Sequence, residues 1–93
     1  MTGRPFPGRL LGIDHGLKVI GLAVCDPTGL IARPLRLLRR TSRRADFAAI
    51  ARLIAEQGAV AVVVGLPLSP PHITVHTQAD TVRLWASRLA AAI

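Results

Sequence analysis

The chain has 93 residues, 51% of them apolar, and its 12 basic and 5 acidic side chains give a net charge of +7. This length limits the chain to one small domain, and the apolar content excludes an intrinsically disordered protein. The longest apolar run, residues 58–68, is too short to cross a bilayer, and no signal peptide is evident, so we expect a cytoplasmic protein that does not enter the membrane.

The first half of the sequence predicts a loose arm followed by a three-stranded antiparallel meander. Residues 1–9 are rich in Gly, Pro and Arg and are expected to form a flexible arm, so the domain covers residues 10–93. The predicted strands are Leu10–Ile13, Lys18–Cys25 and Leu30–Leu38. Asp14–Leu17 forms the first predicted turn, in which Gly16 is available for a positive φ. Pro34 places the third strand at an edge of the sheet.

The spacing of the apolar residues changes to that of a helix in the middle of the chain. Phe47, Ile50 and Leu53 recur at helical intervals. Thr41 or Ser42 is placed to cap this helix, and a glycine at position 58 is placed to end it. A second amphipathic helix is predicted over residues 77–92, with Val82, Trp85 and Leu89 on its apolar face.

A continuous β-branched run, Ala59–Val64, predicts a fourth strand between the two helices. It is apolar on both faces, as in strands that lie inside a sheet covered by helices. The order is therefore β-β-β-α-β-α, an α/β fold in which the fourth strand can pair in parallel with the first. This pairing would bring Asp14 beside Gly65, at the carboxyl ends of two strands, where α/β sheets bind ligands.

Arginine dominates the charge of the chain. Eleven of the 12 bases are arginines, and six of them lie between Arg33 and Arg44. Such a basic patch is typical of proteins that bind the phosphate backbone of nucleic acids, although a biased genome composition would also enrich arginine. From this patch we expect nucleic acid as the partner. The expected contacts in this patch are Arg33, Arg36, Arg39 and Arg40.

Three separated motifs carry a resemblance to a known family. They are DHGxKxIGxAV at residues 14–24, ARP at 32–34 and VVGLPL at 63–68. Together they resemble the YqgF family, also called RuvX, whose members are described as pre-16S rRNA nucleases or Holliday junction resolvases. The resemblance implies a ribonuclease H-like fold and a nuclease that trims the 5′ end of precursor 16S rRNA with Mg²⁺ or Mn²⁺. A Holliday junction resolvase acting on DNA is the alternative within the same class.

The resemblance assigns roles to few residues. It makes Asp14 the catalytic, metal-binding carboxylate, because phosphodiester hydrolysis on this fold uses metal ions held by carboxylates. Lys18 and Arg33 stand where the family has basic residues, and the resemblance thereby makes Lys18 a further expected contact of the nucleic acid, beside Asp14. Gly16 and Gly65 would lie with their backbone near the site.

The chain also departs from the family pattern. Residues 69–73 read SPPHI where the family has an asparagine and a glycine-containing turn. The family continues with a fifth strand and a final helix that bear further acids, so we expect a shortened chain of doubtful activity. Residues 60–64 would then form an exposed sheet edge, open to self-association. A non-catalytic remnant that binds nucleic acid or pairs through this strand is therefore a further alternative.

The other reactive side chains have simpler interpretations. Cys25 is expected to be a buried core thiol. Asp46 and Glu56 are expected to face water on the first helix, and Asp80 suits the first turn of the second helix. His15 neighbours Asp14 and could touch a phosphate, but a histidine in a turn is more often merely exposed.

Overall fold

The structure, a computed structural model, describes residues 8–26, 32–66 and 78–93. Its elements are β1 (Arg9–His15), β2 (Val19–Cys25), β3 (Ala32–Arg39), α1 (Arg43–Gln57), β4 (Ala59–Val64) and α2 (Gln78–Ala92). The predicted order β-β-β-α-β-α is confirmed. Residues 1–7 of the predicted arm and the SPPHI segment lie outside the described residues, whereas Arg9, the last residue of the predicted arm, is the first residue of β1.

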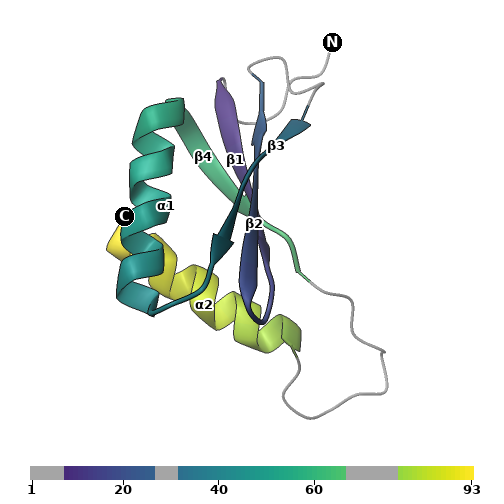
Figure 1. Ribbon diagram of the computed structural model, residues 1–93, viewed down its shortest axis with the longest axis vertical. Helices are drawn as coiled ribbons and strands as arrows, with labels where there is room; N and C mark the ends of the chain where they lie inside the picture. The colour runs from purple at the N-terminus through teal and green to yellow at the C-terminus, as the bar shows by residue number, and fades with distance from the viewer. Residues whose placement is uncertain (1–7, 27–31, 67–77) are drawn as a thin grey trace.

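The four strands form one mixed sheet in the order β3-β2-β1-β4 (Figure 1). Strand β1 pairs antiparallel with β2, with Asp14 opposite Gly21, and parallel with β4. The N–H of Gly65 donates to the carbonyl of Ile13 at 2.9 Å and continues the β1–β4 pairing by one residue. This arrangement confirms the ribonuclease H-like α/β fold, and β3, which contains Pro34, is an edge strand as predicted.

Both helices pack on one face of the sheet. The core combines apolar side chains of β1, β2, α1 and α2: Leu11, Ile13, Ile20, Leu22, Phe47, Ile50, Leu53, Trp85 and Leu89. Neighbouring residues of a strand point to opposite faces. The residues that alternate with these core residues along β1 and β2 therefore lie on the second face of the sheet, which no described helix covers. The described residues therefore form two layers, and they leave one face of the sheet open.

The ends of α1 follow the local signals in the sequence. Ser42 is the N-cap, and its Oγ accepts from the N–H of Ala45 at 3.1 Å. Gly58 adopts φ 63° at the C-terminal end, a left-handed conformation that glycine tolerates best. Both ends were predicted correctly. No helix of the described segments has the length and apolar character needed to span a membrane.

The structure corrects the prediction for the first turn. Asp14 and His15 belong to β1, so the turn is confined to the residues that follow them. Gly16 has no positive φ. Glycine is needed there because a Cβ atom would collide with the carbonyl oxygen of Val19, which accepts from the Gly16 N–H at 3.0 Å.

Burial corrects three further expectations. His15 is only 7% exposed, not a solvated turn residue. Asp46 is only 4% exposed, whereas Glu56 does face water. Cys25 lies in its predicted strand but is only half-buried. The reason at Asp46 is local: its Oδ1 accepts from the backbone N–H of Thr41 at 3.1 Å and from the Thr41 hydroxyl at 3.3 Å.

Candidate functional site

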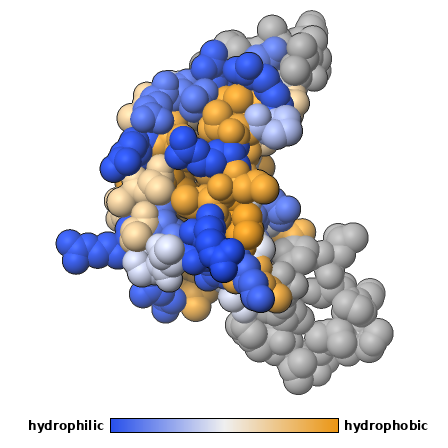
Figure 2. Space-filling view, viewed as in Figure 1, coloured by the Kyte–Doolittle hydropathy of each residue, from blue (hydrophilic) through white to orange (hydrophobic). Residues whose placement is uncertain are grey.

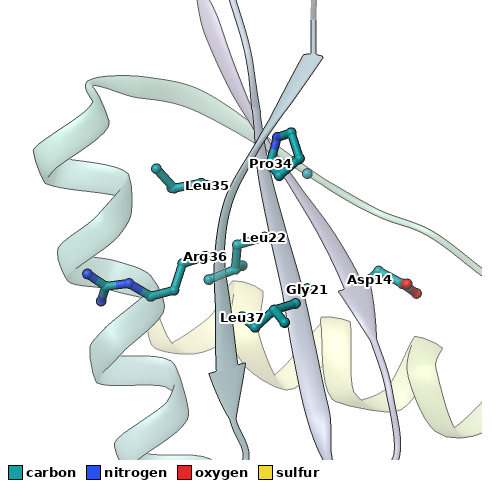
Figure 3. A pocket seen from close by; sticks show the side chains of 9 residues that line it. Asp14, Gly21, Leu22, Pro34, Leu35, Arg36 and Leu37 are labelled. Carbon is teal, nitrogen blue, oxygen red and sulfur yellow. The ribbon is translucent and has the colours of Figure 1, made fainter.

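Asp14 stands at the carboxyl end of β1 on the open face of the sheet (Figure 3). Its side chain is exposed. No hydrogen bond or ion pair occupies its carboxylate within residues 8–26, 32–66 and 78–93. A carboxylate held in this way on a rigid central strand is available to a ligand, and the predicted position beside Gly65 is confirmed by the Gly65–Ile13 hydrogen bond.

The surface beside Asp14 is a shallow depression of about 440 Å³. Gly12 and Gly21 lie next to Asp14 along β1 and across on β2, and both lack a side chain. Pro34 and the exposed Leu37 of β3 form the far side. In Figure 2, hydrophobic side chains gather over the middle of the molecule and hydrophilic ones surround them. An extended strand could therefore approach the sheet closely beside Asp14.

The two backbone amides predicted near the site are both engaged. The N–H of Gly16 donates to the carbonyl of Val19, and that of Gly65 donates to the carbonyl of Ile13. Both glycines lie at the carboxyl end of β1, as predicted, but their N–H groups hold the turn and the strand pair. Neither group is free to bind a phosphate.

Three of the five predicted nucleic-acid contacts meet at the turn end of the sheet. Lys18, Arg39 and Arg40 line one depression of about 440 Å³. Arg39 is opposite Val19 in the β2–β3 ladder, which places it on the same face as Asp14. Lys18 and Arg39 are therefore exposed bases at the turn end of the sheet, and Arg39 lies on the face that carries Asp14.

Arg40 has a structural role in the same place. Its Nη1 donates to the carbonyls of Gly16 at 3.0 Å and Leu17 at 3.1 Å, and its own N–H donates to the carbonyl of Lys18 at 2.9 Å. These contacts fix the β1–β2 turn. The Nε and Nη2 groups of the guanidinium form no hydrogen bond with the residues that the structure describes, and they can act as donors to a ligand.

Arg33 and Arg36 point away from the face that carries Asp14, although Arg36 is among the residues that line the depression beside that carboxylate. They are opposite Val24 and Leu22 in the ladder, so they point to the helix-covered side of the sheet. Figure 3 shows the Arg36 guanidinium extending toward α1. A register shift between Leu22 and Ala23 interrupts the simple alternation of β3. The arginines between 33 and 44 therefore do not form one continuous face.

His15 follows Asp14 but points into the helix-covered side of the sheet. Its ring lies 4.6 Å from the ring of Trp85, centroid to centroid, at an interplanar angle of 54°. Burial lowers the pKa of His15 from its usual 6.5, and the positive charge of Arg40 lowers it further. A hydrogen bond with its own backbone and the charges of Asp14 and Asp46 oppose this shift without reversing it. The imidazole is therefore neutral at pH 7.

The described residues do not make a complete metal centre. Carboxylate oxygens are the ligands that Mg²⁺ and Mn²⁺ prefer, and Mg²⁺ is usually held by one or two carboxylates together with waters and substrate phosphates. Asp14 fits one such ligand position. No group of three or more His, Cys, Asp or Glu side chains gathers around it in the described part of the chain. The structure thus supplies one ligand.

Comparison with known proteins identifies relatives of this sequence. A family described as "RuvX: Holliday junction resolvase" matches residues 8–93. A protein of Moorella thermoacetica named "Putative pre-16S rRNA nuclease" is 39% identical over 91% of this chain and 60% of its own length. A protein of the same name from Picosynechococcus is 41% identical over 92% of this chain and 59% of its own length.

A third relative is more similar over a shorter stretch. The protein of that name from Kineococcus radiotolerans is 50% identical over 68% of this chain, which covers 34% of the relative. The chain thus spans between about a third and 60% of the length of these curated relatives. The matches to the first two relatives cover nine-tenths of the chain, so they include β1, which carries Asp14, and β4, which Gly65 follows.

Proposed function

The chain belongs to the RuvX family, and from this membership we propose that it is a metal-dependent nuclease of the bacterial cytoplasm that trims the 5′ end of precursor 16S rRNA. The names of its relatives support this substrate. The observation that carries the proposal is the exposed carboxylate of Asp14 at the carboxyl end of β1, without a partner among the described residues.

Asp14 is the residue that would hold the metal, either Mg²⁺ or Mn²⁺. A divalent cation in such a site activates a water molecule and stabilises the leaving oxygen of a phosphodiester. Because the described residues supply one carboxylate only, we derive no reaction step through the metal. The function of Asp14 in this proposal is to fix the cation on a rigid strand at the open face.

The residues around Asp14 would position the nucleic acid. Gly12 and Gly21 leave room for a sugar-phosphate strand to approach the sheet. Lys18 and Arg39 are exposed and carry positive charges at the end of the sheet where β1 reaches Asp14. These positive charges attract the phosphate backbone of the nucleic acid whatever its base sequence. The affinity of the chain for nucleic acid is therefore expected to fall as the salt concentration rises.

Two alternatives remain from the sequence. One is a resolvase-like nuclease acting on branched DNA, which the description of the family favours. The other is a protein that binds nucleic acid, or pairs with a second copy through β4, without cleaving. Strand β4 is at an edge of the described sheet, and its Val60 and Val63 are 54% and 52% exposed. These two valines support self-association.

Cleavage assays separate these functions. The chain would be incubated with an RNA spanning the 5′ end of precursor 16S rRNA, and separately with a four-way DNA junction, in Mg²⁺, Mn²⁺ or EDTA. We expect cleavage of the RNA, none in EDTA, and a loss of at least about a hundredfold in Asp14→Asn. Glu56→Gln, which changes an exposed carboxylate on α1, is the matched control and should cleave normally.

The outcomes discriminate clearly. Equal cleavage by the wild-type and Asp14→Asn chains would contradict the assignment of Asp14. Cleavage of the DNA junction alone would favour the resolvase. Salt-sensitive binding of the RNA without cleavage would favour the non-catalytic alternative, and concentration-dependent oligomers without nucleic-acid binding would favour pairing through β4.

A further inference from the structure

A second basic site lies behind Asp14, on the helix-covered side of the sheet. A cavity of about 200 Å³ opens between the end of β1, the start of α1 and the middle of α2. Figure 1 shows these elements converging at the end of the sheet where β1 turns into β2. Because Asp14 and His15 are consecutive in β1 and point to opposite faces, the cavity and the open face share one strand end.

Three arginines converge on this cavity from three segments of the chain. Arg40 precedes α1, Arg43 is its first residue, and Arg88 lies on α2. None of the described side chains that line the cavity is acidic. Like charges repel one another, so three guanidinium groups around one cavity with no acid in its lining indicate a site for an anion.

The geometry of Arg40 suits such a site. Both Nη1 contacts with the β1–β2 turn hold the guanidinium in place. Its remaining donors keep the planar arrangement that matches two oxygens of a phosphate. Arg43 adds a charge at the N-terminal end of α1, where the helix dipole also favours an anion. The site is thus partly preorganised before a ligand arrives.

A buried atom in the wall of the cavity lacks a partner. His15 is 7% exposed, and its Nε2 is buried without a hydrogen-bond partner in the described part of the chain. Buried polar atoms are almost always hydrogen-bonded. Since the His15 ring lines the cavity, a ligand that reaches this atom directly or through a bridging water molecule would supply the missing hydrogen-bond partner.

We propose that this cavity, bounded by Arg40, Arg43, Arg88 and His15, binds a phosphate group. The proposed nuclease function suggests its source, a backbone phosphate of the nucleic acid strand whose cleavage site lies at Asp14. Free phosphate is the other source with the same chemistry. Only the source of the phosphate rests on the proposed function, because the residues that line the cavity indicate an anion site without it.

Trp85 reports directly on this site. It is the only tryptophan of the chain, it lines the cavity, and it contacts His15. The test is a titration of the 93-residue chain with inorganic phosphate at constant ionic strength, followed by Trp85 fluorescence. We expect a saturable change, and a dissociation constant raised about tenfold or more in Arg88→Ala, because a charge-assisted hydrogen bond is lost.

Arg83→Ala is the matched control. Arg83 is an exposed arginine of the same helix that does not line the cavity, so its loss removes the same charge from the chain. We expect its dissociation constant to stay within about twofold of the wild type. A change that does not saturate, or equal weakening in both variants, would mean general charge screening and would overturn the proposal.

A second arm identifies the source of the phosphate. A short single-stranded RNA replaces inorganic phosphate in the same titration. If the site holds a strand phosphate, Arg88→Ala weakens RNA binding more than Arg83→Ala does, and inorganic phosphate competes more strongly than chloride at equal ionic strength. If Arg88→Ala weakens only the binding of free phosphate, the site serves free phosphate. Asp14 does not line the cavity, so the phosphate titration is read without cleavage and a failure of the nuclease proposal is seen separately.

Discussion

Asp14 and His15 are neighbours in β1, yet the Asp14 side chain is exposed on the open face and the His15 side chain is buried against Trp85. The extended backbone of β1 causes this separation, since successive residues of a strand point to opposite faces. One dipeptide therefore connects the candidate catalytic carboxylate with the helix-covered cavity behind it.

Stability should depend on the ionisation of His15. The unfolded chain has a histidine pKa of about 6.5, and burial lowers the pKa of His15 in the fold. Above the pKa of the unfolded chain, His15 is neutral in both states. As the pH falls below that value, the unfolded chain binds the proton first. The free energy of unfolding therefore declines between the unfolded pKa and the lower folded pKa. Urea unfolding in EDTA at several pH values measures this slope.

His15→Phe is the control for that prediction. It keeps an aromatic ring against Trp85 and removes the titrating group. We expect the variant to lose the part of the acid-induced decline that His15 causes. An unchanged slope in His15→Phe would show that other groups control the pH dependence.

Asp46 should matter for folding rather than for catalysis. Its Oδ1 accepts two hydrogen bonds from Thr41 just before α1. Asp46→Ala should lower the free energy of unfolding by about 2 kcal/mol, because hydrogen bonds to a charged group are lost. Glu56→Ala, an exposed carboxylate of the same helix, should change it by less than about 0.5 kcal/mol. Chemical unfolding followed by Trp85 fluorescence compares the two, and equal effects would contradict the assignment.

Arg40 should stabilise the β1–β2 turn. Its Nη1 bonds to the carbonyls of Gly16 and Leu17 are lost in Arg40→Ala. We expect a loss of about 1 to 2 kcal/mol in the free energy of unfolding. Arg44→Ala removes an exposed arginine from the first turn of α1 and serves as the control. A similar stability for both variants would mean that the turn does not depend on Arg40.

Self-association through β4 can be tested by placing a charge on it. Val63→Lys adds a positive charge to a half-exposed position of this edge strand, and lysine on an edge opposes strand pairing. Sedimentation at several protein concentrations should show less association than in the wild type. Leu37→Lys changes an equally apolar, exposed residue on the opposite edge strand. A larger decrease in association for Leu37→Lys than for Val63→Lys would contradict the prediction and would place the contact between chains on β3.

Much of the fold follows from local sequence signals. Ser42 and Gly58 mark the ends of α1, the run Ala59–Val64 marks β4, and helical spacing places Trp85 in the core. The parallel pairing of β1 with β4, and with it the position of Asp14, is compatible with the helical crossover from β3 to β4 that the order of elements predicts. These features depend on residues close together in the chain or on general topology.

The environment of individual side chains was harder to predict. His15 was assigned to a turn, although Leu11, Ile13 and His15 alternate with period two and this pattern could have placed the histidine in the core. The burial of Asp46 depends on a bond to Thr41, and the position of Arg36 depends on a register shift in β3. Such details come from tertiary pairing, which a residue pattern does not specify.

The most direct test of the central claim is to locate a metal ion on the chain. Trace Mn²⁺ broadens the amide NMR signals of residues close to it, and the assigned spectrum would be recorded with and without Mn²⁺ for the wild type, Asp14→Asn and Glu56→Gln. The account predicts broadening centred on Ile13, Asp14 and Gly21, unchanged in Glu56→Gln and lost in Asp14→Asn. Broadening centred elsewhere, or retained in Asp14→Asn, would contradict the assignment of Asp14 as the metal-binding carboxylate.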